Sequence, residues 1–166
     1  MSDATLRPMT DADEAEVLAI NAAAVHQTGP MDAALLRHQR VLSAEHRVVE
    51  RDGRLVAILT ALCGGCGYEG ENFRWFDARF RGFFYIDRIV VAEPARGAGL
   101  GHLVYEHAIA RARELQLHWL AAEVNRQPPN PVSLAFHEGH GFREVGVREV
   151  EPGKLVSLQV RTLSDR

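Results

Sequence analysis

A strand, a glycine-rich turn, a helix and a second strand follow one another between residues 83 and 124, and this order restricts the fold more than any other feature. Residues 83–91 (FFYIDRIVV) are almost all β-branched or aromatic, which predicts a central strand. Apolar residues at helical spacing then predict a helix from Leu100 to Leu115, and residues 118–124 (HWLAAEV) predict another strand. A helix that joins two strands is the usual crossover between parallel strands, so the sequence predicts a βαβ unit.

The other patterns predict strands and helices on both sides of this unit. Asp52-Gly53 separates two β-rich runs and is a strong hairpin signal. A helix is expected after Thr10, with its end before Gly29-Pro30. Further strands are expected over residues 4–8, 46–51, 54–62, 142–150 and 155–160, and further helices over residues 35–42 and 131–140. Because no linker or repeat interrupts this order, we expect residues 1–166 to form a single α/β domain with a mixed sheet.

The composition and charge exclude several classes of protein. Hydrophobic residues make up 46% of the 166 residues and charged residues 25%, as in a globular domain rather than a disordered chain. The net charge of −3 predicts no general attraction to nucleic acid or to an anionic membrane. The N-terminal residues are too polar for a secretory signal, and no run approaches the about 20 apolar residues that cross a bilayer. The expected location is therefore the cytoplasm.

The turn at residues 96–101 (RGAGLG) has the composition of a phosphate-binding site. Closely spaced glycines between a strand and a helix gather free backbone N–H groups at the positive end of the helix dipole. Glycine lets an anion approach the backbone, and Arg96 can add a charge-assisted hydrogen bond. The pattern differs from the dinucleotide-binding fingerprint and from the P-loop, which needs Gly-Lys-Ser/Thr. The alternative is a turn that only makes the corner.

Two motifs together resemble the GNAT superfamily of acyl-coenzyme A dependent N-acetyltransferases. The first is RGAGLG, since the family pattern is Gln or Arg, two residues, Gly, one residue, and Gly or Ala. The second runs from Asn130 to Phe142 and is similar to the family's closing short helix. Residues 123–131 also resemble an uncharacterised subgroup of predicted acetyltransferases. The resemblance implies a GNAT-like fold: a central mixed, mostly antiparallel sheet, flanked by about four helices and splayed between the strands at 83–91 and 118–124.

This resemblance implies acetyl-coenzyme A as the co-substrate, with no metal. The pantetheine arm would pair with the strand edge at Ile89, Val90 and Val91, where an amide would polarise the thioester carbonyl. The pyrophosphate would rest on the amides of Arg96, Gly97, Ala98, Gly99, Leu100 and Gly101. Further coenzyme contacts would come from Asn125, Asn130, Ser133 and Phe136. For the two asparagines, ordinary turn chemistry beside the neighbouring prolines is the alternative.

The implied reaction is transfer of an acetyl group to a primary amine, by direct attack in a ternary complex. The family often uses a tyrosine as the general acid, and His137 stands at the aligned position. Its usual pKa of about 6.5 makes proton donation to a coenzyme A thiolate downhill. Tyr85 is a substitute for that role, whereas Tyr105 is expected to be a packed ring, and a structural histidine is the alternative for His137. Asp87 and Glu123 lie within apolar strands, which fits either a general base or a salt bridge.

Residues 64–82 break the pattern of strands and helices. Long loops without structure of their own often serve as lids or binding loops. An acidic residue there would bind a cationic acceptor, and aromatic residues would form an apolar wall. The acceptor-binding candidates are Tyr68, Glu69, Glu71, Trp75 and Phe76. The alternative is an irregular segment whose aromatic rings only cover the core.

The remaining candidates are two pairs of possible zinc ligands. Cys63 and Cys66, and likewise His137 and His140, are each separated by three positions, and together they would form a Cys2His2 site. A single CxxC pair is weak support for zinc, and its place at a strand end does not favour thioredoxin-like chemistry. Two reduced thiols in a cytoplasmic protein need no special role.

The expected partner is a small-molecule or peptide amine, with no nucleic acid and no membrane. Exposed edges in mixed sheets often pair, which would allow a homodimer. An acyl-coenzyme A binding sensor or partner module without turnover is the alternative function.

Overall fold

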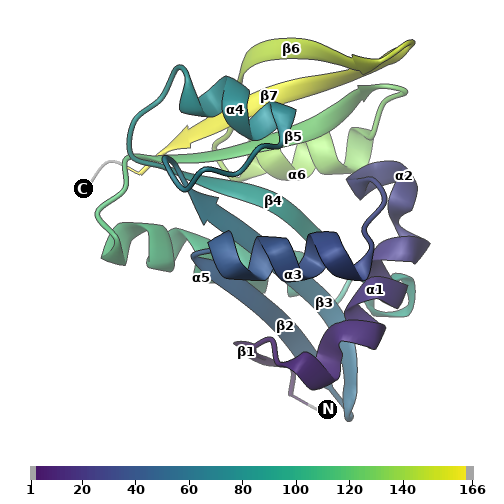
Figure 1. The fold of residues 1–166 in the computed structure, drawn as a ribbon. Coiled ribbons are helices and arrows are strands. Elements are labelled where there is room, and N and C mark those ends of the chain that lie inside the picture. Colours follow the sequence, from purple (N-terminus) through teal and green to yellow (C-terminus); the bar gives the residue numbers. More distant parts are fainter. Residues whose placement is uncertain (1–2, 164–166) are drawn as a thin grey trace. The chain divides into compact units, whose positions relative to one another are not determined.

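The computed structural model describes residues 3–163 and contains a mixed sheet of seven strands flanked by helices (Figure 1). The strand order is β1-β2-β3-β4-β5-β7-β6. The strands are β1 (Thr5–Pro8), β2 (Glu45–Arg51), β3 (Arg54–Cys63), β4 (Phe83–Val91), β5 (Trp119–Gln127), β6 (Arg143–Glu151) and β7 (Lys154–Thr162). The helices are α1 (Glu14–Ala23), α2 (Val25–Thr28), α3 (Ala33–Leu42), α4 (Glu71–Asp77), α5 (Leu100–Glu114) and α6 (Pro131–Gly139), and the 3-10 helices are η1 (Asp11–Asp13) and η2 (Glu93–Ala95).

The described residues form two compact units. The first unit holds residues 3–62 and 86–108, and the second holds residues 63–85 and 109–163. Strand β4 and helix α5 each contribute residues to both. The single domain over residues 1–166 stays a prediction, and residues 1–2 and 164–166 lie outside the described part. We predicted that strands β4 and β5 splay apart. Since β4 contributes residues to both units, this splay also stays a prediction.

The first unit is an antiparallel arrangement covered by two helices. Strand β1 pairs with β2, and β2 pairs with β3 through the predicted hairpin at Asp52-Gly53, where φ is 54° and 71°. Positive φ at both positions is the backbone that a tight hairpin turn requires. Helices α1 and α3 bury Val17 and Leu36 against a cluster that includes Ile58. Figure 1 shows α3 lying across β2 and β3.

The second unit contains the parallel strand pair that the βαβ pattern predicted. Phe83, Phe84 and Tyr85 of β4 pair in parallel with Trp119, Leu120 and Ala121 of β5. Strand β5 then pairs with β7, and β7 with β6, both antiparallel. The mixed sheet is therefore confirmed, since β5 pairs in parallel with β4 and antiparallel with β7.

The prediction for residues 64–82 was partly wrong, because this segment contains helix α4. Phe73 and Phe76 are 1% and 0% exposed, and they lie three positions apart on one face of the helix. Their rings lie 5.4 and 5.9 Å from the ring of Tyr85 in the same unit. Burial of these rings stabilises a helix of only seven residues that would be marginal by itself.

The first unit contains a half-buried histidine with buried ring nitrogens, whose charge opposes folding. His46 of β2 lies opposite Thr60 of β3, and in the described structure no hydrogen bond reaches the imidazole nitrogens or the Thr60 hydroxyl. Burial lowers the pKa of His46 to about 4, and the cations Arg40 and Arg88 add to this effect. The folded protein therefore holds His46 neutral, whereas the unfolded chain binds a proton near pH 6.5.

We expect the free energy of unfolding to fall as the pH decreases from about 6.5 to about 4, because the unfolded chain binds more protons in this range. His46→Gln should reduce this fall, although His137, whose pKa is also lowered, keeps part of it. Urea titrations across this pH range measure the effect. His38→Gln, at an exposed position of α3, is the control and should keep the wild-type slope. An unchanged slope in His46→Gln would contradict the assignment.

Candidate active site

The glycine turn of the first unit has the geometry of an anion cradle. Gly97 and Gly99 have φ of 81° and 76°, and a Cβ at either position would meet no heavy atom within 4 Å. The Leu103 N–H donates to the Gly99 carbonyl at 3.0 Å, so helix α5 begins directly after Gly99. The N–H groups of Leu100 and Gly101 lie in the first turn of α5, where the helix offers no carbonyl to accept them. An anion can reach these amides because the glycines leave the space open.

Arg96 and the end of β4 lie beside this turn. The Arg96 Nε donates to the Val91 carbonyl at 3.2 Å, and the rest of this exposed guanidinium extends from the turn. The Ala92 N–H donates to the Val56 carbonyl of β3 at 2.8 Å. This hydrogen bond holds the chain that follows β4 against β3. Val90 is 4% exposed and belongs to the core, whereas Ile89 and Val91 are half-buried. Pairing of Ile89–Val91 with a pantetheine arm stays a prediction.

Asp87 is held in an ion pair, which agrees with the salt bridge that was one of the two alternatives predicted for it. The Arg88 Nε donates to Asp87 Oδ2 at 2.8 Å, and the two side chains are 6% and 7% exposed. The Gln39 amide of α3 donates to the same oxygen at 3.0 Å. Asp87 Oδ1 has no hydrogen-bond donor among the described residues, so one oxygen remains an acceptor.

The ion pair continues into the helices of the first unit. Arg88 donates to Asn21 Oδ1 of α1 at 2.7 Å, and the Asn21 amide donates to the Gly29 carbonyl at 3.1 Å. The Thr28 hydroxyl also donates to Asn21, at 3.1 Å. This network therefore connects β4, α1 and the end of α2. The salt-bridge alternative for Asp87 anticipated a nearby arginine such as Arg88, whereas sequence reasoning missed Gln39 and Asn21.

Tyr85 and Glu123 form a hydrogen-bonded pair in the second unit. The Tyr85 hydroxyl lies 2.6 Å from Oε2 and 2.8 Å from Oε1 of Glu123, and Tyr85 is 1% exposed. Because Tyr85 is paired with Ala121 across the parallel strands, Glu123 is its diagonal neighbour. The phenol directs its proton at the carboxylate. As a substitute general acid, Tyr85 would first have to exchange this partner.

Helix α6 carries the other coenzyme and acid candidates. Asn130 caps the helix, since its side-chain oxygen accepts from the Ser133 N–H at 3.2 Å, and its own N–H donates to the Asn125 carbonyl at 3.1 Å. The turn chemistry proposed as the alternative is therefore present. Phe136 stacks near His140, with ring centroids 4.2 Å apart. Coenzyme contacts by Asn125, Asn130, Ser133 and Phe136 stay predictions.

His137 is buried on α6, with 7% of its surface exposed. Its Nδ1 lies 2.7 Å from the Ser133 carbonyl, which places a proton on Nδ1 and leaves Nε2 as the acceptor of the neutral ring. Burial lowers the pKa of His137, and this effect exceeds the opposing effect of the Ser133 hydrogen bond. Proton donation from Nε2 therefore requires the imidazolium form, which is populated mainly below the ordinary histidine pKa.

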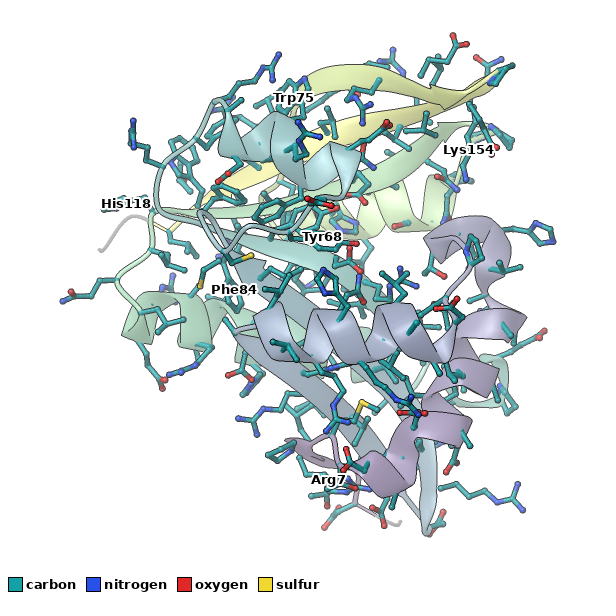
Figure 2. The ribbon with its side chains drawn as sticks, in the orientation of Figure 1. Arg7, Tyr68, Trp75, Phe84, His118 and Lys154 are labelled. Atoms are coloured by element: carbon teal, nitrogen blue, oxygen red, sulfur yellow. The ribbon has the colours of Figure 1, made fainter. Side chains whose placement is uncertain are left out.

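The acceptor candidates on and before α4 have different surroundings. Phe76 is fully buried against the core, whereas Trp75 is half-buried and lies against β6, where a Cβ on Gly146 would come within 2.6 Å of its ring. Exposed Glu71 accepts from Arg148 of β6 at 3.1 Å. Figure 2 labels Trp75 and Tyr68, and the Tyr68 ring meets Phe73 edge-on at 5.6 Å. Acceptor contacts by these residues and by exposed Glu69 stay predictions, and Arg148 is a partner that the sequence did not suggest.

The zinc alternative finds no support in the second unit. The Nδ1 atoms of His137 and His140 each lie within hydrogen-bond distance of a backbone carbonyl four positions earlier. Cys63 and Cys66 are free thiols. Within residues 3–163, no group of three or more His, Cys, Asp or Glu side chains is placed to hold a metal ion.

No helix within residues 3–163 has the length and apolarity needed to cross a bilayer.

Comparison with known families agrees with the turn and the fold. The sequence model described as the Acetyltransferase (GNAT) family matches residues 13–142. The chain therefore belongs to the GNAT acetyltransferase family, whose members are acyltransferases. No curated protein sequence matches it.

Solved structures share the fold over almost the whole chain. Ard1 from Thermoplasma volcanium has a TM-score of 0.80 and 17% identity, with 98% of this chain and 99% of that chain covered. The ribosomal-protein-S18-alanine N-acetyltransferase from Escherichia coli has a TM-score of 0.74 and 15% identity, with 99% and 96% covered. The putative acetyltransferase yncA from Salmonella typhimurium, solved with its cofactor acetyl-CoA, has a TM-score of 0.71 and 19% identity, with 98% and 95% covered. The GNAT-like fold predicted from the sequence is confirmed.

The buried ion pair leads to a test of stability. We expect Asp87→Asn to lower the free energy of unfolding by about 3 kcal/mol, because it leaves the buried Arg88 guanidinium without its counter-charge. Glu14→Gln is the matched control. Its partner Arg37 is 68% exposed, so the loss should stay below about 1 kcal/mol. Urea unfolding at neutral pH measures both, and equal losses would show that Asp87 is not a structural anchor.

Proposed function

We propose that this protein transfers an acetyl group from acetyl-coenzyme A to a primary amine of a small-molecule or peptide acceptor. Acceptor and coenzyme would be bound together, and the amine would attack the thioester directly. Family membership alone does not define the reaction of this chain, and the proposal assigns it one. It is supported first by the open glycine turn at Gly97 and Gly99, where the amides that begin α5 can bind a pyrophosphate.

The coenzyme contacts follow from the first unit alone. The pyrophosphate binds the amides of residues 96–101, and the Arg96 guanidinium, which already reaches back to Val91, neutralises part of its charge. The pantetheine amides pair with residues 89–91. An N–H at the end of this edge polarises the thioester carbonyl as negative charge develops on its oxygen.

The proton transfers are assigned from the hydrogen bonds of each candidate. The attacking amine must lose a proton, and we assign its removal to Glu123. Asp87 is already held by a guanidinium and an amide, whereas Glu123 accepts from the neutral Tyr85 hydroxyl. The departing thiolate must gain a proton, which we assign to the His137 imidazolium through Nε2, while Nδ1 stays on the Ser133 carbonyl. One proton leaves the amine and one reaches the sulfur, so the reaction balances.

Binding of acetyl-coenzyme A should be lost in the double variant Arg96→Glu, Gly99→Glu, because both changes place negative charge where the pyrophosphate binds. Calorimetric titration measures the loss, with circular dichroism as the check on folding. The double variant Arg143→Glu, Gly153→Glu is the control, since it makes the same charge change at an exposed arginine and at an open glycine with φ of 80°. Wild-type affinity in the first variant would refute the site. Binding without release of coenzyme A for any amine tested would favour the sensor function.

His137→Ala should lower kcat by about 10- to 100-fold while changing the affinity for acetyl-coenzyme A much less, because general acid catalysis acts mainly on the transition state. In the wild type, kcat should decline as the pH rises through the lowered pKa of His137, and this decline should be absent in the variant. Thiol release measured across a pH series tests both. His140→Ala is the matched control, since its ring makes the same type of bond, to Phe136. Equal kcat values for wild type and His137→Ala would remove the catalytic role.

A further inference from the structure

The two cysteines close a tight turn at the end of β3. The Cys66 N–H donates to the Cys63 carbonyl at 3.3 Å, and Gly65 between them has φ of 82°. A hydrogen bond from the fourth to the first residue and a positive φ at the third residue describe a β-turn, whose end Cα atoms lie within about 7 Å. A disulfide joins Cα atoms that are about 4.4 to 6.8 Å apart. The backbone thus holds both cysteines at a separation that a disulfide can span.

The turn is held from both sides by other parts of the second unit. The Gly64 N–H donates to the Phe83 carbonyl at 3.0 Å, and the Gly65 N–H donates to Asp77, the last residue of α4, at 2.8 Å. A Cβ on Gly64 would come within 2.5 Å of the Phe83 ring, so the turn packs directly on the aromatic core. These contacts keep the cysteines in place before any oxidation.

Neither cysteine is fully buried. Cys63 and Cys66 are free and half-buried. A cavity of about 270 Å³ lies against the two glycines between them and is also lined by Asp77, Arg79 and Arg81. Arg79 is fixed over the Trp75 ring at 4.2 Å, whereas no hydrogen bond or ion pair ties Arg81 to the described residues. The two guanidinium groups outweigh the single Asp77 carboxylate, so the side chains beside the turn favour anions.

We propose that Cys63 and Cys66 form a reversible intrachain disulfide by exchange with a small anionic disulfide such as oxidised glutathione. This inference does not depend on the acetyl transfer proposed above. It assigns a redox modification site to the end of β3, next to α4.

The exchange takes place in two steps. One cysteine thiolate attacks a sulfur of oxidised glutathione, forms a mixed disulfide and releases one reduced glutathione. The second cysteine thiolate attacks the protein sulfur of this mixed disulfide, forms the Cys63–Cys66 bond and releases the second reduced glutathione. The protein loses two electrons and two protons, and the oxidant gains them. Burial raises the pKa of the Cys63 thiol, so exchange through Cys63 becomes faster as the pH rises.

The test begins with the reduced full-length protein and oxidised glutathione. Alkylation followed by intact mass should show both thiols lost together, with a product lighter by two hydrogens and no lasting glutathione adduct. Cys63→Ser and Cys66→Ser should each stop at a single adduct. Adducts on both cysteines of the wild type, or two thiols that remain reduced, would overturn the proposal. Cystamine, a cationic disulfide, should react more slowly than oxidised glutathione, and Arg81→Glu should remove this difference.

A pair of glycine variants tests the geometry with both cysteines in place. Gly65 and Gly67 both have positive φ and open space around them, but only Gly65 lies between the cysteines. Gly65→Ala should lower the equilibrium ratio of disulfide to dithiol about fivefold, because alanine disfavours the left-handed backbone of the turn and the reduced segment relaxes to a backbone that separates the two thiols. Gly67→Ala should leave the ratio unchanged. The same ratio in both variants would show that the turn does not prearrange the thiols.

Discussion

The buried ion pair between Asp87 and Arg88 determines the arrangement of the first unit. These neighbours on β4 are 7% and 6% exposed in their side chains, and their hydrogen bonds reach α3 through Gln39 and α1 through Asn21. Separation of the two side chains would leave an uncompensated buried charge, which costs free energy. The pair and its hydrogen bonds therefore hold α1, α3 and β4 in one arrangement. The same strand contains residues 89–91, and only the short 3-10 helix η2 separates it from the glycine turn. The position of the backbone that we propose to bind the coenzyme thus depends on this ion pair.

The two strand carboxylates show why residue type alone does not define a catalytic role. Asp87 and Glu123 looked equivalent in the sequence, since each interrupts an apolar strand. In the structure one accepts from a guanidinium and an amide, and the other accepts from a phenol. Asp87 is thus held in a buried ion pair, whereas Glu123 is held by a hydroxyl group. Part of this difference comes from partners far away in the sequence, since Gln39 lies 48 positions from Asp87 and Tyr85 lies 38 positions from Glu123.

Elements with local signals could be predicted from the sequence, whereas those that depend on distant contacts could not. The bounds of β4 and the hairpin at Asp52-Gly53 follow from β-branched residues and from a turn dipeptide. Helix α4 was missed, since its seven residues depend on Phe83 and Tyr85 to bury Phe73 and Phe76. The glycine turn could be predicted as well, because its chemistry lies in its backbone. Gln39 could not, since it meets Asp87 across 48 positions.

The protonation of His137 links the fold of α6 to the proposed chemistry. The Ser133 carbonyl holds Nδ1, so any proton transfer in the reaction must use Nε2. Burial favours the neutral ring, which at Nε2 is an acceptor, whereas donation to a thiolate needs the charged ring. A tyrosine at this position would carry its proton at neutral pH, so histidine gives the acid step a pH dependence that a phenol would not. The departure from the family's usual tyrosine therefore changes the pH range in which the acid is protonated and leaves the direction of proton transfer the same.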